Sequence, residues 1–319
     1  MNHFDLIDGV LHAENVSLAD IADAVGTPVY VYSRATFERH AVVFRAALSG
    51  LDNPHLAFAV KSNPNLAVLK VLARQGYGAD VVSGGEMDRA LAAGMAAEDI
   101  VFSGVGKTAE EMNRALKIGV GQFNIESEEE GQELAALAAA LGLTAQAVLR
   151  INPDVDAGTH GKISTGKADN KFGVGIDRAP GIYARLSILP HLHMRGVALH
   201  IGSQLTSLEP LETAFQKVGV LLQELRAAGH VVTHVDLGGG LGVRYRDGDN
   251  PPDPAEIWRY GRARDQGLGR AVDVRTRPRY RWQCRRLADA RHPREARCGQ
   301  CAVRYRRCRN ERSGAPRAL

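Results

Sequence analysis

A lysine stands at the end of a stretch whose pattern predicts a buried strand. Residues 55–65, HLAFAVKSNPN, alternate large apolar side chains with alanine as far as Lys61, and turn-forming residues follow it. An amine held among apolar side chains loses the hydration that its charged form needs, so its pKa falls and its nucleophilic form becomes accessible. That chemistry suits a Schiff base with a carbonyl compound. The alternative is a lysine that extends its charge into solvent from a strand end.

A cluster of glycines follows another strand-like run. In residues 235–242, VDLGGGLG, the missing Cβ atoms of Gly238, Gly239 and Gly240 let consecutive backbone N–H groups converge on a phosphate. A dinucleotide-binding fingerprint is the rival interpretation. It is disfavoured because the residues after the glycines do not open a helix and because the motif follows the seventh strand-like run instead of the first. A nicotinamide-dependent dehydrogenase is therefore a distant alternative.

Polar side chains end three further strand-like runs. The sixth run ends ALHIGSQ, where His200 could stack on a flat ring or move a proton, and Ser203 could donate to a phosphate. Asp80, in YGADVVSGGE, could pair with a protonated pyridine nitrogen or bond only to its own turn. Arg150 ends the fifth run among polar residues. Taken alone, a strand-end histidine more often has a structural role, so these residues carry weight only as a set.

The elements that must position these residues follow a regular order. Seven strand-like runs begin near Leu56, Tyr77, Ile100, Gln122, Ala145, His193 and Val231, and helix-like stretches separate them. Strand–helix units at this short spacing argue for a parallel sheet, and seven in succession fit a (β/α)8 TIM-type barrel better than a doubly wound sheet. At one barrel mouth the set supplies an amine, a phosphate cradle, a ring neighbour and a carboxylate. This combination describes a pyridoxal phosphate site.

The N-terminal segment, residues 1–27, precedes this repeat. A strand is predicted over Leu6–His12 and a helix over Ser17–Val25, and a further strand over Pro28–Tyr32 opens the barrel region, residues 28–255. The segment has no basic stretch followed by an apolar one, and no run of eighteen apolar residues occurs in the sequence. Neither a signal peptide nor a membrane span is predicted, and we expect a cytoplasmic protein.

The last part, residues 256–319, differs in kind from the rest. It holds 19 Arg, no Lys and 6 acidic residues, whereas the preceding sequence holds 21 Lys and Arg against 30 Asp and Glu. No eighth apolar strand is evident there, so the predicted barrel lacks its eighth strand. An open barrel would expose sheet edges, which predicts poor solubility.

Two interpretations of this arginine-rich tail are open. A basic arm could bind nucleic acid through its phosphates, although such an arm usually contains lysine and avoids the tryptophans and cysteines found here. We favour a GC-rich gene read out of frame from a point near residues 253–257, and we expect no nucleic-acid partner. Cys298-x-x-Cys301 lacks a second cysteine pair at zinc-site spacing, so no metal site is predicted.

Eight short stretches, taken in order, resemble a known family. They are FAVKSNPN, ADVVSGGE, FSGVGK, NIES, RINPDV, KFG, HIGSQ and DLGGGLG, and over about residues 1–253 they resemble the fold-type III pyridoxal-phosphate decarboxylases, above all the diaminopimelate decarboxylases. The resemblance implies decarboxylation of meso-2,6-diaminopimelate to L-lysine, the last step of lysine biosynthesis, in a homodimer. A related arginine or carboxynorspermidine decarboxylase is the alternative within the family.

The resemblance also implies roles for individual residues. Lys61 would bind pyridoxal 5'-phosphate covalently, His200 would stack on its ring, and Asp80 would lie near it. Ser203 together with Gly238, Gly239 and Gly240 would hold the phosphate. Arg150 and Lys171 would shape the mouth through which the amino-acid substrate enters.

Two family features have no counterpart in this sequence. The family continues with a Glu-Pro-Gly-Arg segment after its eighth strand and then a C-terminal β-domain that carries Cys-Glu-Ser and whose cysteine reaches the partner subunit's site, and neither motif occurs here. The resemblance places residues 1–27 in that β-domain. We therefore expect little or no decarboxylase activity from this chain, and the alternative outside the enzyme class is a non-catalytic pyridoxal-phosphate binder with a nucleic-acid-binding tail.

Overall fold

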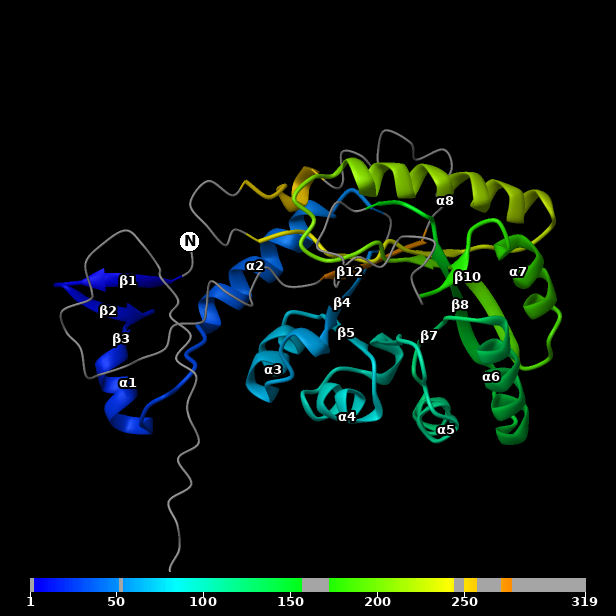
Figure 1. Ribbon diagram of the computed structural model, residues 1–319. Coiled ribbons are helices and arrows are strands. Elements are labelled where there is room, and N and C mark those ends of the chain that lie inside the picture. The colour runs from blue at the N-terminus through cyan, green and yellow to red at the C-terminus, as the bar shows by residue number, and fades with distance from the viewer. Residues whose placement is uncertain (1–2, 52–53, 157–171, 244–249, 257–270, 277–319) are drawn as a thin grey trace, which may run out of the picture.

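The computed structural model describes residues 3–51, 54–156, 172–243 and 250–256, and the backbone of 271–276. Its centre is a curled parallel sheet (Figure 1). The seven predicted strands are confirmed as β4 (His55–Ala59), β5 (Gly78–Val81), β6 (Ile100–Phe102), β7 (Gln122–Ile125), β8 (Ala145–Asn152), β10 (Leu192–Leu199) and β11 (His234–Asp236). A two-residue strand, β9 (Val174–Gly175), adds to the end of β8. The α/β barrel class predicted from the repeat is confirmed.

The eighth position of the sheet is filled, which corrects the expectation of a missing strand. The backbone of β12 (Ala271–Thr276) pairs in parallel with β11 on one side and with β4 on the other. Because β8 also pairs with β10, the order of the eight long strands returns to its starting point. The sequence AVDVRT has the period-2 pattern of a strand, but it is only six residues long and is flanked by arginine-rich stretches, so it does not stand out. The predicted open edges between β11 and β4 are therefore not observed.

Helices cover the outside of the sheet. Four predicted helix-like stretches form α3 (Leu66–Arg74), α4 (Gly84–Ala92), α5 (Ala109–Ile118) and α6 (Glu128–Leu141), while α2 (Arg34–Ala47), α7 (Ala179–Ser187) and α8 (Glu209–Ala227) complete the layer. Ser83, Thr108 and Ser127 each accept a backbone N–H at a helix start, as the Ser/Thr-x-x-Glu spacing predicts. Of these three helices, the one capped by Thr108 has a full capping box, because the Glu111 side chain also accepts a hydrogen bond from the backbone N–H of Thr108.

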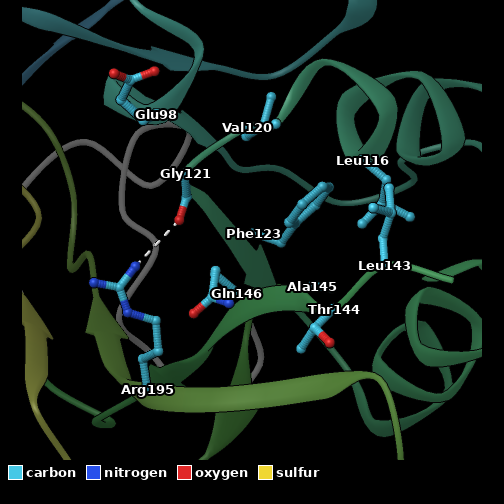
Figure 2. A pocket seen from close by; sticks show the side chains of 11 residues that line it. Glu98, Leu116, Val120, Gly121, Phe123, Leu143, Thr144, Ala145, Gln146 and Arg195 are labelled. Carbon is cyan, nitrogen blue, oxygen red and sulfur yellow. Dashed lines mark hydrogen bonds between the residues drawn. The ribbon is translucent and has the colours of Figure 1, made fainter. Parts of the chain in front are cut away.

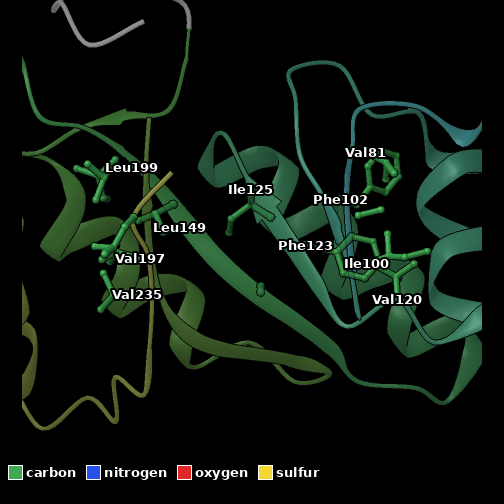
Figure 3. Close-up of a cluster of buried hydrophobic side chains, with 14 of the residues drawn as sticks. Val81, Ile100, Phe102, Val120, Phe123, Ile125, Leu149, Val197, Leu199 and Val235 are labelled. Carbon is green, nitrogen blue, oxygen red and sulfur yellow. The ribbon is translucent and has the colours of Figure 1, made fainter. Parts of the chain in front are cut away.

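The main core lies between the strands and these helices. Figure 3 shows buried side chains in two groups, one around Phe102 and Phe123 and one around Val197 and Val235, with Ile125 between them. The rings of Phe102 and Phe123 have their centroids 6.2 Å apart. Tight packing of this kind fixes the positions of the strand ends that carry the polar residues.

A small unit precedes α2 in the chain. It consists of β1 (Phe4–Ile7), β2 (Val10–Ala13), β3 (Val16–Ser17) and α1 (Leu18–Val25), and it has its own apolar cluster. The single strand predicted over Leu6–His12 is wrong, because Asp8 and Gly9 adopt positive φ angles and turn the chain into an antiparallel hairpin. The predicted helix is confirmed with Ser17 as its cap, while Pro28–Tyr32 contains only an isolated bridge residue.

None of the described helices combines the length and the apolar character that crossing a membrane requires.

Candidate active site

The C-terminal ends of the parallel strands carry the polar residues singled out in the sequence. Asp80 lies in β5 and Arg150 in β8, while Lys61, His200 and the glycine-rich turn come directly after β4, β10 and β11. Because these strands run in parallel around one sheet, their ends lie at one rim. The rest of the site is built on this rim.

Lys61 lies in a single turn of 3-10 helix, Val60–Ser62, that follows β4. Val60 is fully buried, but the chain turns outward after it and Lys61 is exposed. The expectation of an amine surrounded by apolar protein side chains is therefore wrong for this residue.

Glu86 lies close enough to Asp80 and to Lys61 to interact electrostatically with both. Burial raises the pKa of Glu86 above its ordinary value, the negative charge of Asp80 adds to this rise, and the positive charge of Lys61 opposes it. Asp80 is buried, whereas Glu86 is half-buried and accepts a hydrogen bond from the Val82 N–H at 2.9 Å. The Ser83-x-x-Glu86 spacing by itself predicts only a helix cap for Glu86. Its position three residues after Ser83, close to Asp80 in the chain, was the available signal.

The loop after β10 and the glycine-rich turn after β11 pack backbone against backbone. The Leu205 N–H donates to the Gly240 carbonyl at 2.9 Å, and the Gly242 N–H donates to the Leu205 carbonyl at 2.8 Å. A Cβ on Gly238 would lie 2.2 Å from the Leu199 carbonyl oxygen, and one on Gly240 would lie 2.0 Å from the Gly202 carbonyl oxygen. Glycine is therefore required at both positions, and the turn lies directly beside Ser203.

Arg150 is buried and already engaged. Its Nη1 donates to Glu126 Oε1 at 2.7 Å, and its guanidinium carbon lies 4.9 Å from the centre of the Phe172 ring. Glu126 also accepts from the Gly104 N–H at 3.2 Å and the Gly173 N–H at 2.9 Å. This carboxylate thereby joins three loops of the rim, and sequence reasoning did not single it out. Lys171 lies outside the described residues.

A second buried polar group fills part of the barrel interior. Gln122 and Asn124 alternate along β7 with Phe123 and Ile125, and all four are buried. Asn124 Nδ2 donates to Asp236 Oδ2 at 3.0 Å, although the two residues lie on strands that are not neighbours. The signal in the sequence was a polar–apolar alternation inside a sheet buried on both faces, where the polar side chains need partners within the barrel.

A cavity of about 410 Å³ lies at the opposite end of the barrel. It is lined at the starts of strands by Gly121, Phe123, Gln146 and Arg195 (Figure 2). Arg195 donates to the Gly121 carbonyl there at 3.2 Å. None of the predicted site residues that the structure describes lines this cavity, so it is separate from the rim that carries Lys61.

Comparison with known proteins adds to this geometry. The family model for the pyridoxal-binding domain of pyridoxal-dependent decarboxylases matches residues 34–266. The chain belongs to the pyridoxal-dependent decarboxylase family. Over 274 residues it is 53% identical to diaminopimelate decarboxylase of Pseudomonas fluorescens. This match covers 85% of this chain and 65% of that protein. It is also 53% identical to the Vibrio cholerae enzyme of that name, over 78% of this chain and 59% of the relative.

Solved structures of such decarboxylases share the fold. Diaminopimelate decarboxylase from Helicobacter pylori complexed with L-lysine matches with a TM-score of 0.77 and 37% identity, over 80% of this chain and 64% of that one. The enzyme from M. jannaschii in co-complex with L-lysine matches with a TM-score of 0.80 and 31% identity, over 88% and 67%. The chain spans about two thirds or less of the length of these relatives.

The residues at the rim fit the cofactor of the decarboxylase family. A phosphate needs backbone donors held in place, and Gly238 and Gly240 fix the glycine-rich turn by packing too closely on the loop after β10 to admit a Cβ. An aldehyde needs an accessible amine, which the exposed Lys61 supplies. A protonated pyridine nitrogen needs a carboxylate, and the buried Asp80 lies in β5, the strand beside β4, with Glu86 close to both Asp80 and Lys61.

Proposed function

We propose that this barrel binds pyridoxal phosphate at its C-terminal rim and is the cofactor-binding part of a diaminopimelate decarboxylase, the enzyme class that converts meso-2,6-diaminopimelate to L-lysine. The observation that carries the proposal is the accessible amine of Lys61 on the same rim as a tightly packed glycine-rich turn, in a pyridoxal-binding barrel. The choice of substrate rests on relatives that carry this name at 53% identity and on two related structures that hold L-lysine.

Each rim residue has one task in this proposal. The Lys61 amine would hold the cofactor through its aldehyde group and would give up that place to the amine of the substrate. Asp80 would keep a proton at the pyridine nitrogen, and His200 would pack on the ring. Ser203 and the turn Gly238–Gly240 hold the phosphate through hydroxyl and backbone donors. When bound, pyridoxal phosphate supplies the sink for the electron pair that carbon dioxide leaves behind.

Arg150 borders the entrance in this proposal, and the same role for Lys171 rests on the family resemblance alone. The Arg150 guanidinium is held between Glu126 and the Phe172 ring, so it shapes the entrance by fixing the neighbouring loop. The fixed guanidinium restricts which amino acids can enter, and this selection takes place before any bond is broken.

Cofactor attachment provides the first test. Borohydride reduction of the protein with pyridoxal phosphate, followed by peptide mapping, is expected to label Lys61. Lys61→Ala should abolish the label, while Lys70→Ala, an exposed lysine on α3, should leave it unchanged. Label at other lysines with position 61 unmodified would overturn the proposed site.

Substrate choice is tested on the loaded protein by absorbance. We expect meso-diaminopimelate to change the cofactor spectrum at lower concentrations than L-arginine or carboxynorspermidine. A response to L-arginine or carboxynorspermidine at the lower concentration would assign the chain to a related decarboxylase instead.

We also infer that the chain forms a homodimer, which rests on the resemblance to a family with a shared active site. Sedimentation of the loaded protein as a monomer at micromolar concentration would contradict this inference.

A further inference from the structure

We propose that a buried polar network inside the barrel fixes the conformation of the phosphate-binding turn, and that Asp236 is the residue of this network that positions the turn. The inference rests on the proposed pyridoxal phosphate site and deepens it. It concerns which backbone donors of the glycine-rich turn are left for the phosphate, and what holds them there.

Asp236 is the last residue of β11, and each of its two carboxylate oxygens accepts a hydrogen bond from a different residue. Oδ1 accepts from the Gly238 N–H at 2.9 Å, and Oδ2 accepts from Asn124 Nδ2 at 3.0 Å. The residue has no exposed surface. A buried carboxylate is costly unless its oxygens are bonded, so these two hydrogen bonds help to keep it in place.

Asn124 is in turn fixed by two neighbours. Its Nδ2 also donates to Ser103 Oγ at 3.1 Å, and its Oδ1 accepts from Gln122 Nε2 at 2.8 Å. These bonds determine which end of the Asn124 amide faces Asp236. The network therefore ties the turn to β6 and β7, which pair with each other but not with β11.

The bond to Asp236 turns the Gly238 N–H toward the barrel interior. Gly238 is held there with a φ of +70°, and the Gly240 carbonyl is fixed by the Leu205 N–H. Within the part of the chain that the structure describes, the N–H groups of Gly239 and Gly240 have no hydrogen-bond partner. The turn thus offers the amides of Gly239 and Gly240 to a phosphate, and the Gly238 amide serves to hold the turn.

The test compares pyridoxal phosphate with pyridoxal, which has the same aldehyde and ring but no phosphate. The readout is the ratio of their dissociation constants, measured by absorbance on the full chain. Asp236→Asn places two amide donors face to face against Asn124 or loses the bond to Gly238. We expect binding of pyridoxal phosphate to weaken about tenfold, the factor that corresponds to one hydrogen bond of ordinary net strength. Binding of pyridoxal should stay within about twofold, since it does not use the turn.

A paired exchange provides the rescue. In Asn124→Asp with Asp236→Asn, the new amide at position 236 can donate to the new carboxylate at 124 while its oxygen still accepts from the Gly238 N–H. The Ser103 hydroxyl can rotate to donate, and Gln122 keeps its acceptor. We expect this double variant to recover the preference for pyridoxal phosphate. Asp88→Asn, the same change in an exposed ion pair on α4, is the matched control and should have no effect.

Three outcomes would overturn the inference. Asp236→Asn could keep the phosphate preference, it could weaken both ligands equally, or the double variant could fold without regaining the preference. If Asp236→Asn alone does not fold, the double variant decides. Failure of the proposed function looks different, because the unaltered protein would then bind pyridoxal phosphate no better than pyridoxal.

Discussion

Glu126 holds three loops of the barrel rim through one carboxylate. It bonds the Arg150 guanidinium and the backbone N–H groups of Gly104 and Gly173, and its side chain and that of Arg150 are only 4% and 7% exposed. For a buried ion pair of this kind, removing one partner lowers the stability by more than the intact pair adds to it, because the remaining charge is left buried and uncompensated. In the sequence Glu126 belongs to the family-like stretch NIES, but its place between a strand and a helix cap does not reveal these three partners.

Removal of Arg150 is therefore expected to destabilise the protein strongly. Arg150→Met should lower the free energy of unfolding in urea by about 3 kcal/mol, because Glu126 loses its counter-charge in a buried site. Arg114→Met, which breaks the exposed ion pair with Asp88, should change it by less than about 1 kcal/mol. Equal losses in the two variants would show that burial is not the cause.

The carboxyl of Glu86 gives the stability a dependence on pH. Burial raises its pKa in the folded protein above the ordinary value of 4.5, so folding is penalised when the carboxyl is ionised. The stability that the protonated form provides is full below pH 4.5 and is lost as the pH rises through the folded pKa. Glu86→Gln should therefore raise the melting temperature at neutral pH, and the gain should disappear below pH 4.5. A gain that is the same at every pH would contradict this assignment.

Elements with a clear local signal could be predicted, and those that depend on distant contacts could not. The strands β4 to β8 and the capped helices between them follow from apolar runs and turn residues. The short strand β12 was not predicted, because six alternating residues have little local preference for a strand. Its position depends on pairing with β11 and β4 on either side. The members of the site were found one by one at strand ends, whereas Asn124 and Asp236 meet only after the sheet curls.

The glycine-rich turn gives a prediction for a single added methyl group. Gly240 has a φ of +109°, and a Cβ there would meet the Gly202 carbonyl. Gly240→Ala is expected to lower the free energy of unfolding by about 2 kcal/mol and to abolish binding of pyridoxal phosphate. Gly219→Ala, within α8 where no atom lies near the added Cβ, should stabilise the protein by up to about 1 kcal/mol. Chemical denaturation and absorbance titration measure the two effects, and an inert Gly240→Ala would refute the packing argument.

At the scale of the whole molecule, composition separates residues 256–319 from the rest. We propose that this part is read out of frame. Finding no Glu-Pro-Gly-Arg in either other frame of the gene beyond codon 255 would remove that idea. Apart from Glu256 and the backbone of β12, this part lies outside the described residues.

The decarboxylase activity of the chain can be measured directly. We expect the purified chain to release little or no carbon dioxide from meso-diaminopimelate, because the family's Glu-Pro-Gly-Arg and Cys-Glu-Ser segments do not occur in it. Replacing residues 257–319 with the corresponding part of the Pseudomonas fluorescens relative should restore turnover. A rate above about 1 per second from the unaltered chain, within the usual range for enzymes, would refute the expectation.

The position of β12 between β4 and β11 also bears on how the protein is made. On the ribosome β4 emerges about 200 residues before β12, yet the two pair side by side. A partner so distant along the chain makes closure of the ring a late event, and until then the nascent protein presents two unpaired backbone edges to its neighbours. The interval between synthesis of β11 and synthesis of β12 is therefore when the growing chain most needs a chaperone.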